Sequence, residues 1–114
     1  RFIAARGIGT PLNEDMVRLV NGVTGWNMSL KELERIGERI YNLERLINVR
    51  RGVSRKDDTL PFRAMNEPIP DGPVKGRFCL QKDLDAMLDA YYELRGWDPE
   101  GIPTDGKLKE LGLM

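Results

Sequence analysis

Histidine is absent from this sequence of 114 residues, and cysteine occurs once, at Cys79. Because histidine is the commonest general base and a frequent metal ligand, its absence removes the usual acid–base catalyst. One cysteine without histidine excludes a cysteine-protease dyad, a zinc finger and a self-contained iron–sulfur site among these residues. A single cysteine also forbids an intramolecular disulfide, which fits a reducing, cytoplasmic setting.

An excess of charge of either sign is also lacking, since 18 lysines and arginines balance 18 aspartates and glutamates. Nucleic-acid binding usually leaves a strong basic excess, so the sequence predicts no nucleic-acid partner. No apolar run approaches the ~18 residues of a transmembrane helix, and the opening RFIAARGIG is too short and glycine-rich for a secretory signal. We therefore expect no membrane partner and a cytoplasmic protein.

The composition otherwise fits a folded domain. Hydrophobic residues make up 40% and charged residues 32%, as in soluble globular chains rather than disordered ones. The length allows at most one domain with a modest core. The chain begins at Arg1 instead of a methionine, followed by apolar residues typical of an element's interior. This start favours a truncated piece of a longer protein.

Apolar spacing predicts an all-α fold, an irregular multi-helix bundle with a long Pro/Gly-rich connecting loop. Thr10-Pro11 is a favourable helix start, Gly25 and Gly96 are helix stops, and Thr104 can cap the last helix. The spacing of apolar residues places helices at about 11–24, 29–48, 81–95 and 104–111.

The second of these helices carries the clearest signals. Ser29 and Glu32 have the spacing of a capping box, in which each side chain bonds the other residue's backbone. Gly37 interrupts the helix at a cost of about 1 kcal/mol, and we expect it to permit close packing against another helix. The apolar residues that repeat at helical spacing are Leu33, Ile36, Ile40, Leu43 and Ile47.

Residues 49–79 show no periodicity and form the predicted extended loop. Prolines and glycines recur along it, and an irregular connection of this length is unusual in a compact domain. Disordered linkers rarely carry many apolar residues, so we expect this loop to wrap a surface outside the chain. The apolar residues that support wrapping are Val53, Leu60, Phe62, Met65, Ile69 and Val74.

The densest charge cluster is RRGVSRKDD, residues 50–58. Basic groups here that could contact an anion or a cofactor phosphate are Arg50, Arg51, Arg55 and Lys56. Opposite charges interleave, so we favour ion pairs with Asp57, Asp58 and neighbouring acids that lock the loop. Adjacent aspartates are commonly turn or cap devices, and the following Thr59-Leu60-Pro61 enforces extension, which argues against a metal or acid–base pair.

Three further candidates have plainer interpretations. Cys79 lies between apolar neighbours and is interpreted as a small buried hydrophobe. Tyr91, Tyr92 and Trp97 could line a ligand pocket, but their helical spacing beside a glycine turn favours core packing. The stretch RGIG at residues 6–9 lacks the third glycine and the preceding strand of a phosphate-binding loop.

Several stretches resemble the C-terminal helical part of the aldehyde:ferredoxin oxidoreductase family of tungsten enzymes. They are GERIYNLERLINVRRGVSRKDDTLPFR (37–63), EPIPDGPVKG (67–76) and LDAMLDAYYELRGWDPEGIPTDGKLKELGL (84–113). The resemblance runs from about residue 19 to residue 113, and RKDDTLP and YYELRGWD with GIPT are its most specific parts. It implies that residues 1–114 are part of the helical C-terminal domain of a larger oxidoreductase.

The resemblance further implies a cytoplasmic, mostly anaerobic parent enzyme that holds tungsten, or molybdenum, through two pterins beside a [4Fe–4S] cluster. Such enzymes oxidise aldehydes to carboxylic acids and pass electrons to ferredoxin. The family's cluster cysteines fall outside this chain, and Cys79 matches no ligand position. The resemblance therefore assigns no catalytic, cofactor-binding or metal residue here, and we expect the fragment alone to be inactive.

Two alternatives remain open on the sequence. The chain could be a free-standing helical interaction module whose long loop binds a partner protein. The parent could also belong to the aryl-CoA reductase branch of the same family, which reduces aromatic acyl thioesters. The expected partners of the favoured interpretation are the rest of the parent chain and ferredoxin, and the sequence leaves the substrate and the oligomeric state open.

Overall fold

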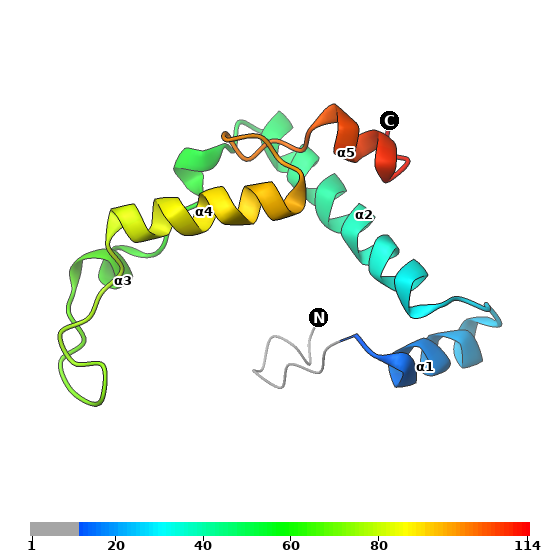
Figure 1. Ribbon diagram of the computed structural model, residues 1–114, viewed down its shortest axis with the longest axis horizontal. Helices are drawn as coiled ribbons and strands as arrows, with labels where there is room; N and C mark the ends of the chain where they lie inside the picture. The colour runs from blue at the N-terminus through cyan, green and yellow to red at the C-terminus, as the bar shows by residue number, and fades with distance from the viewer. Residues whose placement is uncertain (1–11) are drawn as a thin grey trace. The chain divides into compact units, whose positions relative to one another are not determined.

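A computed structural model describes residues 12–114, and its regular structure in that range is helical (Figure 1). The elements in order are α1 (Glu14–Thr24), α2 (Leu30–Arg50), the 3₁₀ turn η2 (Arg55–Asp57), α3 (Phe62–Asn66), α4 (Gln81–Arg95) and α5 (Asp105–Glu110). No β-strand forms in the described range, where the extended pairing is an isolated antiparallel bridge between Trp97 and Pro103. The predicted all-α class is confirmed.

The chain divides into two compact units, residues 1–41 and 42–114, and the boundary falls inside α2. The first unit contributes α1 and the start of α2, and the second contributes the remaining elements. No helix between residues 12 and 114 is both long enough and apolar enough to cross a membrane.

Helix α1 begins later than the sequence suggested. Asn13 is its N-cap, and the Asn13 side chain accepts a hydrogen bond from the backbone N–H of Met16 at 3.0 Å. The predicted start at Thr10-Pro11 lies outside the described residues. Gly25 ends the helix at a φ of 73° and donates its N–H to the Asn21 carbonyl, which confirms the predicted stop.

The capping box of α2 is confirmed. The Ser29 backbone N–H donates to the Glu32 carboxylate at 2.8 Å, and the Glu32 N–H donates to the Ser29 hydroxyl at 3.3 Å. The Ser29 hydroxyl also donates to the Glu32 carboxylate at 2.8 Å, and the hydrogen bonds that the carboxylate accepts, first from the backbone and then from the side chain of Ser29, lower the pKa of Glu32. The local sequence signal alone was sufficient here because all of its partners lie within four residues.

The predicted helix is confirmed as α2, and the C-terminal half of its apolar stripe is exposed among the described residues. Ile40, Leu43 and Ile47 are 56%, 48% and 42% exposed, whereas the buried residues of this helix are Asn42 and Arg45. A Cβ added at Gly37 would meet nothing within 4 Å among the described residues, so the expected close helix packing stays a prediction. Periodicity identified the apolar stripe of α2, but the other described residues pack against its opposite, polar side.

The connecting segment 49–79 is more regular than expected. It contains η2, whose Ser54 and Asp57 form a second capping box, and the short helix α3. Further along, the Ile69 N–H donates to the Arg77 carbonyl at 3.0 Å, which closes a turn. The expectation of a structureless loop missed α3 because the helix is one turn long and begins directly after a proline.

The core of the second unit lies between α4, α5 and the segment that joins them. Gly96 ends α4 at a φ of 68°. The ring of the next residue, Trp97, packs against the Tyr92 ring with 5.9 Å between the two ring centroids. Thr104 caps α5 by accepting from the Lys107 N–H. The buried apolar residues of this unit are Leu84, Tyr92, Trp97, Leu108 and Leu111. The predicted core packing of Tyr92 and Trp97 is confirmed.

Gly101 sits where no other residue fits. Its φ is +76°, and a Cβ built there would overlap Arg45 Nη2 and lie 2.9 Å from Tyr92 Cζ. The backbone must therefore be bare at this position so that Arg45 and Tyr92 can reach it.

We predict that Gly101→Ala destabilises the folded chain by about 3 kcal/mol, since it adds overpacking to the strain of a left-handed backbone. Gly112→Ala is the matched control, because Gly112 has a φ of +65° and open space around it. The control should cost only the backbone strain, about 1 kcal/mol. Chemical denaturation of both variants measures the difference, and equal losses would show that the close approach at Gly101 is not tight.

Candidate functional site

Asp58 and Arg45 form a two-pronged ion pair in the second unit. Arg45 Nη1 donates to Asp58 Oδ1 at 2.8 Å, and Arg45 Nη2 donates to Asp58 Oδ2 at 2.5 Å. The two side chains are 9% and 24% exposed. Tyr92, from α4, donates its hydroxyl to the same Oδ2 at 2.5 Å. Helix α2, the segment after η2 and helix α4 are thus joined at one carboxylate.

The remaining face of Arg45 contacts the loop that precedes α5. Arg45 Nε donates to the Gly101 carbonyl at 2.7 Å, and the guanidinium carbon lies 5.0 Å from the centroid of the Trp97 ring. Trp97 Nε1 donates to the fully buried Asn42 side chain at 2.8 Å. Because Asn42 and Arg45 are three residues apart, they project from the same face of α2. That face is buried through hydrogen bonds and aromatic contacts instead of aliphatic packing.

Arg55 makes a parallel set of contacts from η2. Its Nη1 donates to Asp89 Oδ1 at 2.6 Å and to the Pro99 carbonyl at 3.2 Å. The guanidinium carbon stands 5.4 Å from the Tyr92 ring centroid, and its Nη2 donates to the Asp85 carbonyl. Arg45 and Arg55 therefore both contact the loop after α4, and Arg55 also contacts the Tyr92 ring.

The environment sets the charge states of the network. Burial raises the pKa of Asp58, but hydrogen bonds from Arg45 and Tyr92 and the charges of Arg45 and Arg55 outweigh it, so the pKa is lowered overall. Burial, followed by the hydrogen bond to Asp58, raises the pKa of Tyr92 to about 12. Asp58 is held as a carboxylate and Tyr92 as a neutral donor, so neither is poised to exchange a proton near neutral pH.

The polar groups of this network are engaged with one another. Both Asp58 oxygens accept from Arg45, and one also accepts from Tyr92. Every buried side-chain nitrogen and oxygen in the described range has a hydrogen-bond partner. The same range contains no group of three or more His, Cys, Asp and Glu side chains that could hold a metal ion. These residues do not fit a tungsten or iron–sulfur site, and the arrangement serves to fasten chain segments together.

The structure assigns different surroundings to the charged residues of the cluster 50–58. Asp58 and Arg55 enter ion pairs, as the locking interpretation predicted, although their partners are Arg45 and Asp89. Asp57 caps η2 by accepting from the Ser54 N–H, which agrees with a cap role. Arg50, Arg51 and Lys56 are exposed and lie outside this network. The stretch 6–9 lies outside the described residues.

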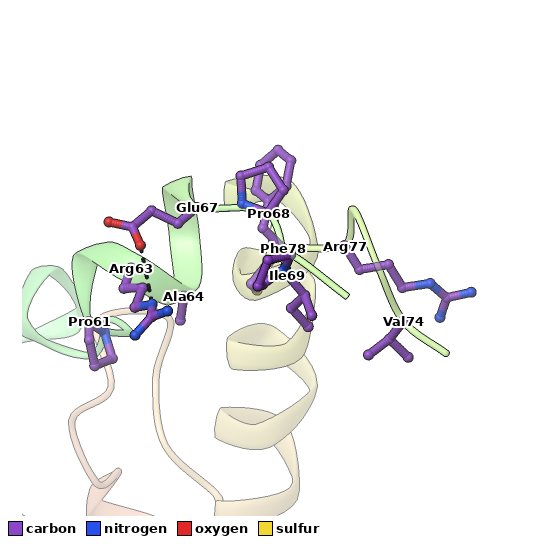
Figure 2. A pocket seen from close by; sticks show the side chains of 11 residues that line it. Pro61, Arg63, Ala64, Glu67, Pro68, Ile69, Val74, Arg77 and Phe78 are labelled. Carbon is purple, nitrogen blue, oxygen red and sulfur yellow. Dashed lines mark ion pairs between the residues drawn. The ribbon is translucent and has the colours of Figure 1, made fainter. Parts of the chain in front are cut away.

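A second feature is an apolar groove of about 790 Å³, lined by α3 and the turn that follows it (Figure 2). Ile69, Val74 and Phe78 contribute apolar side chains to it, and each is at least 40% exposed. Cys79 lies in this lining and is only partly buried, whereas the sequence predicted a small buried hydrophobe.

Sequence reasoning missed the two residues on which the network depends, Asn42 and Arg45. Both lie on the side of α2 opposite the apolar stripe, where solvated polar residues are the ordinary expectation. Their spacing of three residues was visible, but their partners Trp97 and Asp58 are 55 and 13 residues away. No local signal marks such pairs.

Comparison with protein families gives a match that covers nearly the whole chain. Residues 5–113 match the family described as aldehyde ferredoxin oxidoreductase, domains 2 & 3.

Individual relatives agree with this match. The chain is 46% identical over 101 residues to a tungsten-containing aldehyde ferredoxin oxidoreductase from Pyrococcus horikoshii, covering 88% of the chain and 16% of that protein. It is 45% identical to the enzyme of the same name from Pyrococcus abyssi, covering 94% of the chain and 17% of that protein. An aliphatic sulfonate oxidoreductase, WOR-like subunit, from Pyrococcus furiosus is 38% identical over 88% of the chain and 17% of its own length. The chain thus spans about a sixth of the length of these relatives.

We predict that Arg45→Met costs about 3 kcal/mol of folding free energy, because it leaves the Asp58 carboxylate largely buried without its cation. The control is Arg63→Met, which removes an ion pair to Glu67 whose side chains are 80% and 55% exposed. That change should cost less than about 1 kcal/mol. Denaturant titration of both variants measures their free energies of unfolding. Similar losses would mean that the Arg45–Asp58 pair contributes no more than a surface ion pair.

We also predict that acid weakens the fold through Asp58. Its folded pKa lies below the unfolded value of about 3.9, so its contribution is complete above that value and is lost as pH falls through the folded pKa. In Asp58→Asn this contribution is absent at every pH, so the variant should lose less stability than the native chain below about pH 4. Melting temperatures from pH 6 to pH 2 measure this, and parallel curves would contradict it.

Proposed function

The chain belongs to the aldehyde ferredoxin oxidoreductase family, in the part described as domains 2 & 3, and from this membership we propose the function of its parent protein. The parent is a tungsten, or molybdenum, pterin and iron–sulfur enzyme that oxidises aldehydes to carboxylic acids with ferredoxin as electron acceptor. The observation that carries this proposal is the 45–46% identity, across 88–94% of the chain, to relatives named as tungsten-containing aldehyde ferredoxin oxidoreductases.

The role of residues 1–114 within that enzyme is structural. The only cysteine is Cys79, and the best-placed carboxylate, Asp58, has both oxygens engaged by Arg45. In our proposal the metal, pterin and cluster ligands come from other parts of the polypeptide, and this chain alone is inactive. The enzyme works in the cytoplasm under anaerobic conditions.

A second candidate reaction is the oxidation of aliphatic sulfonates. The 38% identity to the WOR-like subunit of a sulfonate oxidoreductase supports it. The identities to the aldehyde enzymes are higher over a similar share of the chain, which favours aldehydes. The same long matches to enzymes also favour an enzyme part over a free-standing interaction module.

The test uses the full-length polypeptide that contains this sequence, purified from its own cells without oxygen. We expect tungsten or molybdenum together with about four irons per chain, as one [4Fe–4S] cluster requires. Adding an aldehyde should reduce ferredoxin, whereas an aliphatic sulfonate with oxidised ferredoxin, or an aryl-CoA thioester with reduced ferredoxin, should give little turnover. A metal-free protein would contradict the enzyme proposal, and turnover restricted to sulfonate would establish the second candidate in its place.

A further inference from the structure

The apolar groove beside α3 is formed within one short stretch of chain. Its lining comes from residues 61–79, and its volume of about 790 Å³ is enough to receive several side chains. In Figure 2, Pro68, Ile69 and Phe78 lie in the middle of the view, between the α3 side chains and the turn that carries Val74. The groove is therefore an apolar surface presented by the segment that connects η2 with α4.

The backbone under this groove is held in place by its own hydrogen bonds. The Ile69 N–H donates to the Arg77 carbonyl at 3.0 Å, and the Gly76 N–H donates to the Ile69 carbonyl at 2.8 Å. The Cys79 N–H donates to the Ala64 carbonyl at 2.9 Å, which ties the end of the turn back to α3. Preorganisation of this kind lowers the entropic cost of binding a partner segment.

The charges at the rim are unequal. Arg63 and Glu67 pair with each other at 3.2 Å across one turn of α3, so their charges cancel. Arg77 lies at the opposite edge in Figure 2, and its guanidinium points away from that pair. The rim therefore carries one net positive charge, and its complement is an apolar segment with a carboxylate.

We propose that this groove receives another part of the same polypeptide, outside residues 1–114, through an apolar segment that places a carboxylate opposite Arg77. This inference rests on the proposed function, because it takes the chain to be part of a longer enzyme. The chain makes up only 16–17% of the relatives it matches, so most of the parent polypeptide is available to cover the groove. A covalently linked segment also has a high effective concentration at the groove.

A second copy of the chain is a poorer occupant than a linked segment. In a two-fold symmetric dimer the same patch meets itself, so an Arg77 from each copy would approach the shared axis. Two like charges in such an interface are unfavourable. A linked segment has no such symmetry and can supply the opposite charge.

The experiment maps what lies against the groove in the full-length, metal-loaded protein. The photo-crosslinking amino acid p-benzoylphenylalanine replaces Ile69, which lines the groove, and in a matched protein it replaces Lys109, which is exposed on α5. After irradiation, mass spectrometry identifies the linked peptides. We expect Ile69 to give an intramolecular crosslink to a peptide outside residues 1–114 and Lys109 to give none. A crosslink from Ile69 to a second copy or to a different protein, or no crosslink to a peptide outside residues 1–114, would overturn the proposal.

The charge requirement is tested in the same protein. Arg77→Glu should lower the yield of the Ile69 crosslink several-fold, whereas Lys75→Glu, an exposed residue of the same turn outside the groove lining, should leave it unchanged. An equal effect of both changes would contradict the assignment of a carboxylate opposite Arg77. The crosslink reports geometry and does not require turnover. An inactive protein with the crosslink would therefore refute only the aldehyde reaction, and an active protein without it would refute only the groove assignment.

Discussion

The fork between Arg45 and Asp58 is the interaction on which the second unit depends. One guanidinium joins α2 to the segment after η2, contacts the Gly101 carbonyl and stacks on Trp97. A charge taken out of water is tolerated only when it is paired and its hydrogen-bonding groups are satisfied, and both conditions hold here. The aliphatic core of the unit is small, so the polar network joins elements that hydrophobic contact alone would leave loosely placed.

The sequence predicted those features whose causes are local. The Ser29–Glu32 capping box and the bounds of α4 at 81–95 follow from residues within a few positions of each helix end. The buried side of α2 could not be predicted in this way, since periodicity reports which residues are apolar and not what lies against them. The polar network could not be predicted from the sequence for the same reason. Asn42 and Arg45 have the pattern of solvent-exposed residues, and only the folded chain places Trp97 and Asp58 against them.

Exposed apolar surface is the other consequence of this arrangement. Ile40, Leu43 and Ile47 follow a clean helical spacing yet lie open among the described residues, as do Ile69, Val74 and Phe78 at the groove. Scattered exposed apolar residues need no explanation, but a periodic helix face and a concave groove are unusual together in one short chain. Membership in a family whose matched members are about six times longer gives both surfaces a reason to be apolar.

The polar core also bears on what this chain can contribute to an enzyme. A buried ion pair is seldom the most stabilising choice, because aliphatic side chains of similar volume often give equal or greater stability. A fork does, however, specify which residue meets which, since only one register satisfies Arg45, Asp58, Tyr92 and the bare Gly101 backbone together. That register sets where the segment after η2 leaves the core and so where α3 begins. In the enzyme proposed above, this chain would contribute to the reaction by holding such surfaces in place against other parts of the polypeptide.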